Sequence, residues 1–223
     1  MSQTMVITID GPAASGKSSV SRELAHRLGW KWVSTGAFYR GLAFVADALK
    51  YNMQDEKALA QLARSSSWQV VMGHEKTSVL FEGRDVTDEI SLEEVGNLAS
   101  QISSHPEVRR ALLDAQRQCV VGLPGLVAEG RDCGTVVFPQ ADLKIFLTAR
   151  AENRAARRAK DEGRSVAETQ DAQRIRDSQD ANRKEAPMAA SLDAYTIDTS
   201  ALNFMEVVLK VENLVKAHLG LLK

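Results

Sequence analysis

Short apolar segments alternate along most of this chain with longer stretches in which apolar residues recur at helical spacing. The short segments cover residues 5–9, 31–33, 125–128, 143–147 and 194–197. Strands that alternate with helices are typical of a parallel sheet with helices on both faces. The sequence therefore predicts an α/β fold with a doubly wound, five-stranded parallel sheet. Its 223 residues fit one such body with appendages better than two independent domains.

Residues 67–90 break this alternation. Three short stretches separated by turns are typical of a small antiparallel meander: 68–72, 78–82 and 85–87. We expect this meander to be an insertion outside the main sheet. Two helices are predicted after it, over 91–103 and 106–121, the second with Pro106 in its first turn and its end before Gly122.

The first strand leads into a loop that can hold phosphate. Residues 11–18 form the pattern G-x-x-x-x-G-K-S, and apolar positions at helical spacing follow over 19–28. The glycines let successive backbone N–H groups point at one anion, Lys17 can reach the β and γ phosphates, and the Ser18 hydroxyl can bind Mg²⁺. The dipole of the following helix favours the same anion. We expect ATP and Mg²⁺ here, with contacts from Gly11, Pro12, Ala13, Ala14, Ser15, Gly16, Lys17, Ser18 and Ser19.

Polar residues also follow other predicted strands. They lie at 34–36, 129–132 and 198–200, and ligands of doubly wound sheets bind at the carboxyl ends of the strands. Arg176, Asp180 and Arg183 have the i, i+4, i+7 spacing of one helix face. Two hypotheses remain open for this face: a solvated surface with ion pairs, or part of a phosphoryl-transfer site, which the phosphate loop favours.

Composition and charge narrow the classes of function. The 28 basic and 29 acidic residues give a net charge of −1, so no overall field attracts nucleic acid or anionic lipid. Cys119 and Cys133 are the two cysteines, no Cys/His cluster has metal-ligand spacing, and no apolar run approaches the length of a membrane span. We expect a cytoplasmic protein that acts on small molecules, without a nucleic-acid or membrane partner.

These motifs together resemble one family closely, the bacterial cytidylate kinases, which are nucleoside monophosphate kinases. The similar stretches run in order through nearly the whole chain: 7–12 with Gly16 and Lys17, 35–40, 99–101, 108–109, 123–125, 130–139, 144–147 and 176–183. Many families share the phosphate loop, whereas 130–139 together with the meander is far more specific.

The resemblance implies one kinase domain over residues 1–223 with three parts. They are a core of residues 1–36, 105–153 and 166–223, a monophosphate-binding insertion at about 37–104, and a short lid at about 154–165. It also implies a monomer that transfers the γ-phosphoryl group of ATP to CMP or dCMP, giving ADP and CDP or dCDP.

The resemblance carries the family's functional residues onto this chain by position. Those implied for the CMP phosphate are Thr35, Arg40, Arg131, Arg176 and Arg183. Asp180 would meet the ribose, and those implied for the cytosine are Ser100, Arg109 and Asp132, with Tyr39 in the same substrate site. The implied catalytic side chains are Lys17, Arg131, Arg176 and Arg183, and the lid arginines that meet the ATP phosphates are Arg154, Arg157 and Arg158. The chain departs from the family pattern at Thr35 (usually serine), Glu129 (often aspartate) and Gln179 (commonly charged).

Two rival hypotheses remain, and the second comes from another class of protein. The first is a P-loop kinase for another small molecule, of the UMP, AMP or shikimate type, and the cytosine-reading residues argue against it. The second is a nucleotide-binding switch protein of the GTPase type. Its N-K-x-D and D-x-x-G motifs do not occur in the sequence.

Overall fold

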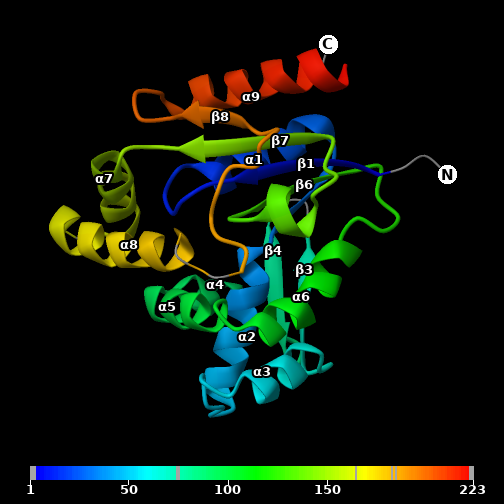
Figure 1. The fold of residues 1–223 in the computed structure, drawn as a ribbon, viewed down its shortest axis with the longest axis vertical. Helices are drawn as coiled ribbons and strands as arrows, with labels where there is room; N and C mark the ends of the chain where they lie inside the picture. The colour runs from blue at the N-terminus through cyan, green and yellow to red at the C-terminus, as the bar shows by residue number, and fades with distance from the viewer. Residues whose placement is uncertain (1–3, 74–75, 164, 182, 184, 221–223) are drawn as a thin grey trace.

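A computed structural model of the chain describes residues 4–73, 76–163, 165–181, 183 and 185–220. Its central feature is a five-stranded parallel sheet in the order β2-β6-β1-β7-β8 (Figure 1). The strands are β1 (Met5–Asp10), β2 (Lys31–Ser34), β6 (Gly125–Gly130), β7 (Leu143–Thr148) and β8 (Tyr195–Asp198). The predicted five-stranded, doubly wound sheet is confirmed.

Helices cover both faces of the sheet, as parallel strands require. One face packs against α1 (Lys17–Leu28) and α9 (Phe204–Leu219), in a core that joins Ile7 to Leu24 and Val208. The other face packs against α6 (Pro106–Gln118) and η1, a π-helical turn (Cys133–Val137). No helix in the described part of the chain is long and apolar enough to cross a membrane.

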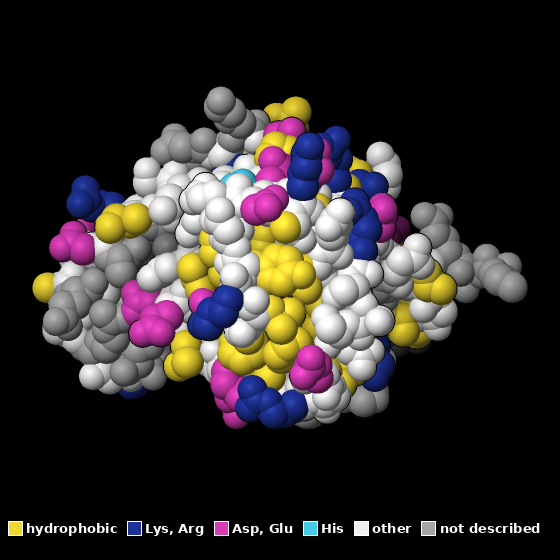
Figure 2. All heavy atoms as spheres, turned by 90° about the horizontal axis from the view of Figure 1, so that it is seen from below, with side chains coloured by type: hydrophobic (Ala, Val, Ile, Leu, Met, Phe, Trp, Pro, Cys, Tyr) yellow, Lys and Arg dark blue, Asp and Glu magenta, His cyan; other side chains and the backbone are white. Residues whose placement is uncertain are grey.

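An insertion follows β2 and projects below the sheet in Figure 1. It contains α2 (Gly36–Ala48), α3 (Glu56–Ala63), α4 (Thr87–Ser91) and α5 (Glu93–Ile102), with an antiparallel sheet of β3 (Trp68–Met72), β4 (Thr77–Phe81) and β5 (Arg84–Asp85). The predicted meander outside the main sheet is therefore confirmed. Figure 2 shows apolar side chains gathered on this lower face, and exposed apolar residues of the insertion include Leu49, Tyr51 and Val71.

Three details of the predicted elements are wrong. Thr87, expected in the third meander strand, begins α4, because its backbone N–H donates to Asp85 Oδ1 at 2.9 Å in a local turn. The helix expected over 91–103 is interrupted at Leu92, whose ψ of 149° is extended. The helix expected over 106–121 ends at Gln118, since the residues from there to Gly122 form turns.

Two helices, α7 (Ala151–Glu162) and α8 (Val166–Ala181), lie beyond the carboxyl ends of the strands (Figure 1). Most of the expected lid falls on α7 and on the turn after it, while Arg164 lies outside the described residues. Because α8 ends at Ala181, Arg183 lies past the helix, so the expectation that it shares a helix face with Asp180 is wrong. Arg176 belongs to α8, but its side chain lies outside the described part of the structure.

Gly41→Ala should destabilise the protein. A Cβ at Gly41 would lie 2.9 Å from Trp68 Cζ3 and 3.0 Å from Val79 Cγ1, so both side chains would have to shift within the core. Overpacking costs about 1–3 kcal/mol, which exceeds the roughly 1 kcal/mol that alanine gains over glycine in a helix. We expect denaturant titration to show a net loss of about 1 kcal/mol in the free energy of unfolding.

Gly36→Ala is the matched control for this prediction, because it lies in the first turn of the same helix. Its Cβ would meet only Ser34 Oγ, at 3.7 Å, which is an ordinary contact. Equal losses of stability in the two variants would contradict the packing argument.

Candidate active site

The phosphate loop joins β1 to α1 and curls around the start of that helix. The φ angles of Gly11 (151°), Ala14 (57°) and Gly16 (91°) are all positive, which gives the loop its tight curvature. Lys17, the first residue of α1, is buried, and its Nζ donates to Pro12 O at 3.2 Å across the loop. The predicted loop therefore has the local form that its motif requires.

Gly11 lies where no side chain fits. A Cβ at this residue would lie 2.1 Å from the backbone oxygen of Leu147 in β7. Since that contact is with backbone, it cannot be relieved by moving a side chain. The loop can leave the sheet at this point only because residue 11 is glycine.

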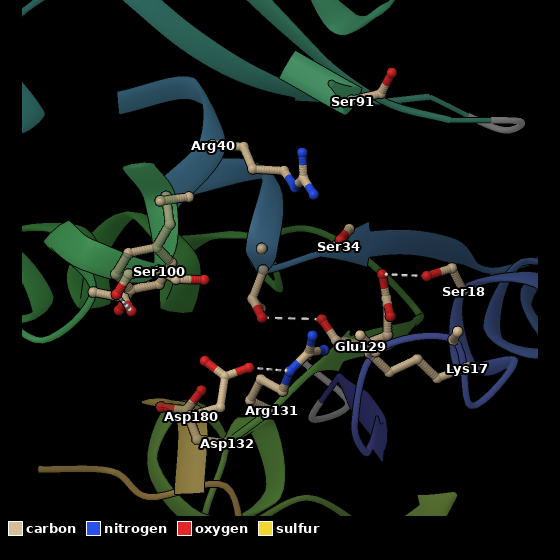
Figure 3. A pocket seen from close by; sticks show the side chains of 18 of the residues that line it. Lys17, Ser18, Ser34, Arg40, Ser91, Ser100, Glu129, Arg131, Asp132 and Asp180 are labelled. Carbon is tan, nitrogen blue, oxygen red and sulfur yellow. Dashed lines mark hydrogen bonds and ion pairs between the residues drawn. The ribbon is translucent and has the colours of Figure 1, made fainter. Parts of the chain in front are cut away.

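Two cavities meet at this loop. The first, of about 360 Å³, is enclosed by the loop, the start of α2, α5, the end of β6, and side chains of α7 and α8 (Figure 3). The second, of about 500 Å³, lies against residues 14–20, and Arg157, Thr199 and residues 202–204 also line it. Ala14, Lys17 and Ser18 line both cavities. One loop is therefore shared by two binding spaces.

The first cavity brings together most of the residues predicted for the substrate. The predicted residues that line it are Thr35, Tyr39, Arg40, Ser100, Arg131, Asp132, Asp180 and Arg183, together with Arg158 from the expected lid. Arg109 does not line the cavity itself and contacts it through Asp132. Positions that are far apart in the sequence therefore lie together around one cavity.

A buried ion pair lies at the end of the cavity nearest the insertion. Arg109 Nη2, from α6, donates to Asp132 Oδ2, and the Arg109 Cζ lies 5.6 Å from the centre of the Tyr39 ring. Burial raises the pKa of Tyr39 to about 12, so its hydroxyl keeps its proton at neutral pH. On the neighbouring helix, Ser103 Oγ donates to Ser100 O at 2.8 Å. This end of the cavity thus offers both hydrogen-bond donors and a carboxylate acceptor.

Two arginines share one carboxylate at the α8 side of the cavity. Arg131 Nε donates to Asp180 Oδ2 at 2.8 Å (Figure 3), and Arg183 Nη2 donates to Asp180 Oδ1. Burial lowers the pKa of Arg183, Asp180 raises it, and the nearby Arg109 lowers it further. Because two cations meet one anion here, this wall carries an excess of positive charge that suits a phosphate.

Arg40 and Thr35 are held by backbone carbonyl groups. Arg40 Nη1 donates to Ile90 O at 2.5 Å and to Leu92 O at 3.1 Å, where the backbone between α4 and α5 is interrupted. Thr35 Oγ1 donates to Glu129 O at 2.9 Å. These bonds fix both side chains on the cavity wall.

The three predicted lid arginines lie in three different places. Arg157 Nη2 donates to Thr199 O at 2.7 Å and lines the second cavity, whereas Arg158 lines the first. Arg154 is buried, and its Nη1 donates to Ala13 O at 3.2 Å and to Asp177 Oδ2 at 2.5 Å. Arg154 thus binds the backbone of the phosphate loop rather than lining either cavity.

Ser18 and Glu129 together offer oxygen atoms for a cation. Ser18 Oγ donates to Glu129 Oε1 at 3.0 Å (Figure 3), and Glu129 Oε2 is buried without a hydrogen-bond partner. Within the described residues, no cluster of three or more His, Cys, Asp or Glu could hold a metal unaided. Mg²⁺ in phosphoryl-transfer sites takes one or two protein ligands and completes its shell with phosphate and water. The pair fits that requirement.

Sequence reasoning did not assign a role to Asp10 or Glu129, although each directly follows a predicted strand. Asp10 accepts the backbone N–H of Cys133 at 2.9 Å and that of Gly134 at 2.7 Å. Burial raises its pKa to about 6, against the lowering effect of these two bonds. The position of Asp10 and Glu129 directly after predicted strands was the signal that could have pointed to them. Nothing in the sequence indicated that residues 202–204 line the second cavity.

Comparison with known families gives one consistent match. The family model described as cytidylate kinase matches residues 7–217. A cytidylate kinase of Bdellovibrio bacteriovorus is 60% identical over 212 residues, which cover 95% of this chain and 98% of that protein. A cytidylate kinase of Methylococcus capsulatus is 45% identical over 222 residues, covering 96% and 97% of the two chains.

Solved structures with a similar fold are much more distant in sequence. A gluconokinase from Sinorhizobium meliloti is 13% identical with a TM-score of 0.51, covering 97% of this chain and 95% of its own. An uncharacterized protein from Eubacterium ventriosum is 11% identical with a TM-score of 0.56, covering 96% and 99%. At these identities the likeness concerns the fold alone.

Asp10→Asn should remove a pH-dependent part of the free energy of unfolding. Because the pKa of Asp10 rises from 3.8 to about 6 on folding, the folded state binds the proton more tightly. The resulting stability is complete below about pH 4 and is lost as the pH rises through about 6. The free energy of unfolding of the wild type relative to Asp10→Asn should therefore fall by roughly 2 kcal/mol between pH 4 and 7.

Denaturant titrations at several pH values would measure this difference, with Asp85→Asn as the control. The pKa of Asp85 is lowered to about 2, chiefly by hydrogen bonds from Thr87. Its contribution is therefore present above about pH 4 and lost as the pH falls through about 2, so it stays constant between pH 4 and 7. A constant difference between wild type and Asp10→Asn over that range would contradict the prediction.

Proposed function

The chain belongs to the cytidylate kinase family and phosphorylates CMP with ATP as the donor, and on that premise we propose how its residues bind both nucleotides and transfer the phosphoryl group. One observation carries the proposal: Ala14, Lys17 and Ser18 line both cavities. A phosphoryl group can move between two sites only if donor and acceptor meet in line at one point. The phosphate loop is that point.

The first cavity is the proposed CMP site. Cytosine presents an amino donor beside ring acceptors, whereas uracil presents the opposite polarity. Asp132 would accept from the amino group. Arg109, which is paired with Asp132 behind the cavity wall, would exchange part of that pairing to donate to the ring acceptors, with help from Ser100. The Tyr39 ring supports Arg109 from below by a cation–π contact. dCMP, which carries the same base, would be accepted as well.

The opposite end of this cavity would bind the CMP phosphate and ribose. The residues proposed for the phosphate are Thr35, Arg40, Arg131, Arg176 and Arg183. The ribose would meet Asp180, whose carboxylate Arg131 and Arg183 already orient. An incoming dianion relieves the repulsion between neighbouring arginines, which is one of the causes that lower the pKa of Arg183.

The second cavity is the proposed ATP site. Residues 11–19 would hold its phosphates through backbone N–H groups and Lys17, with Arg157 and Arg158 on the lid side. Ser18 and Glu129 would hold Mg²⁺, which neutralises charge on the phosphates when it is bound. Arg154 would serve from its place against Ala13 O by holding the loop in shape.

The chain's own residues supply positioning and positive charge to the transfer. As phosphoryl transfer spreads negative charge over the moving group, Lys17, Arg131, Arg176 and Arg183 would stabilise the transition state. The second pKa of a phosphate monoester lies near 6, so the acceptor is largely ionised at neutral pH and needs no general base.

The proposed enzyme is a monomer in which a core, an insertion and a lid have separate tasks. The proposed parts are residues 1–36, 105–153 and 166–223 for the core, about 37–104 for the monophosphate-binding insertion, and about 154–165 for the lid. ATP and CMP are metabolites of the cytoplasm, so we expect the enzyme to act there.

Lys17→Ala should lower kcat by about 100-fold or more, because it removes a positive charge from a side chain that lines both cavities. Steady-state assay of ADP release would measure it, with circular dichroism to show that the fold is kept. Lys57→Ala is the control, because Lys57 is exposed on α3 away from both cavities. Activity of Lys17→Ala within threefold of the control would refute the role of the loop.

A panel of acceptors tests the base assignment. The same ADP-release assay with CMP, dCMP, UMP, AMP, GMP and shikimate should give CMP and dCMP the highest kcat/KM. Each mismatched polar contact with the wrong base costs about 1–3 kcal/mol of binding free energy. Buried polar groups left unpaired can raise the discrimination between acceptors to about 10⁴ in kcat/KM. Asp132→Ala should narrow the CMP/UMP ratio of kcat/KM by about 10-fold or more.

Asp132→Asn and Asp114→Ala complete this test. Asp132→Asn keeps the shape of the side chain while removing its charge, and Asp114→Ala changes an exposed carboxylate on the same α6 helix that carries Arg109. If Asp132→Ala lowers kcat/KM equally for CMP and UMP, so that their ratio is unchanged, Asp132 is structural and the cytosine assignment must be withdrawn.

A further inference from the structure

Asp10 connects the phosphate loop to the turn that carries Asp132. Asp10 is 5% exposed, and each oxygen of its carboxylate accepts a backbone N–H: Oδ1 from Cys133 at 2.9 Å and Oδ2 from Gly134 at 2.7 Å. These N–H groups belong to the first two residues of η1, which begins directly after Asp132. Asp10 therefore fixes the backbone immediately beside the proposed base-reading carboxylate.

The same residue is covalently joined to the donor side of the site. Asp10 ends β1, and the phosphate loop begins with the next residue, Gly11. In the sheet, Asp10 is the register partner of Gly130 on β6, two residues before Asp132. One side chain thus bridges the strand that carries the donor loop and the turn that follows the acceptor strand.

The surrounding packing leaves this bridge little freedom. A Cβ on Gly134 would lie 2.9 Å from Thr8 Oγ1 and 3.4 Å from Asp10 Oδ2, and one on Gly130 would lie 2.3 Å from Thr35 Oγ1. Side chains in such a tight environment transmit a displacement rather than absorb it. A shift of the η1 backbone would therefore move Asp132.

We propose that Asp10 is a positioning residue for base recognition, which holds Asp132 at a fixed place relative to the phosphate loop through the two N–H groups of η1. This inference rests on the proposed role of Asp132 in reading cytosine. Asp10 acts through the backbone, and it does not line either cavity.

The carboxylate suits this task better than a neutral side chain. It accepts two N–H bonds at once, whereas an asparagine amide has one acceptor and would turn its NH₂ toward the second N–H. The other acidic group that faces it is Asp132, and the Cys133 thiol also lies against it. Lys144 lies beside Gly134 with its stem, and its Nζ binds Pro139 O and Asp193. Burying a carboxylate is costly, and its two bonds to η1 offset part of that cost.

A double-mutant cycle tests the proposal. The kcat/KM values for CMP and UMP are measured in wild type, Asp10→Asn, Asp132→Ala and the double variant, all below their unfolding temperatures. Asp10→Asn should narrow the CMP/UMP ratio by about 10-fold while the KM for ATP changes less than about twofold. In the Asp132→Ala background, Asp10→Asn should leave the ratio unchanged, because the group that it positions is gone.

Asp142→Asn is the matched control. The Asp142 carboxylate also accepts a backbone N–H of β1, that of Val6 at 2.7 Å, but at the other end of the strand. The CMP/UMP ratio of kcat/KM in Asp142→Asn should equal that of the wild type. An Asp10→Asn variant that loses activity equally for CMP and UMP would overturn the inference, as would equal narrowing in Asp142→Asn.

Two further outcomes are distinguishable. If Asp132→Ala itself leaves the ratio unchanged, the proposed base assignment fails, and the inference that depends on it fails with it. If Asp10→Asn does not fold, Arg117→Gln carries the test, because Arg117 holds the other end of η1 by donating to Val136 O at 2.9 Å and Val137 O at 3.0 Å. That variant should narrow the ratio in the same direction, and an unchanged ratio would overturn the proposal.

Discussion

The register of the parallel strands is the constraint on which the site depends. Ser34 pairs with Glu129 across β2 and β6, Asp10 pairs with Gly130 across β1 and β6, and Thr148 pairs with Asp198 across β7 and β8. Apolar residues buried on both faces fix this register, since a shift of one residue would turn the core outward. Every polar segment that follows a strand is thereby delivered to one edge of the sheet. The active site is a consequence of how the core packs.

Several charged side chains at that edge are held in ion pairs, and one carboxylate binds two arginines. Asp132 is paired with Arg109, Asp180 with two arginines, and Asp177 with Arg154. Taking such groups out of water is costly, and their mutual attraction offsets part of that cost. Under the proposed function, a bound nucleotide exchanges contacts with these groups rather than meeting bare charges. Binding energy then comes from the difference between two sets of polar contacts, which favours selectivity over raw affinity.

The sequence predicts those parts of the molecule that local patterns determine. The strands follow from short apolar runs, and the loop from a motif whose glycines are required by backbone geometry, as the contact between Gly11 and Leu147 O shows. Patterns failed where tertiary contacts override them. The backbone breaks at Leu92, where the carbonyl groups of Ile90 and Leu92 bind Arg40, and α8 stops before Arg183. The pairing of Arg109 with Asp132 joins α6 to the end of β6, and only the resemblance to a family suggested that they belong together.

A loop that turns its N–H groups toward phosphate must turn its carbonyl groups the other way. Those carbonyls lie in a buried part of the molecule, where an unpaired oxygen is costly. Three donors from other elements meet them: Arg154 and Gln173 donate to Ala13 O at 3.2 and 3.0 Å, and Thr199 Oγ1 donates to Ser15 O at 3.3 Å. Gln173 and Thr199 therefore help to hold the loop in shape, as its glycines do. Arg154 therefore contacts the site through a buried carbonyl of the loop, whereas Arg157 and Arg158 line the two cavities.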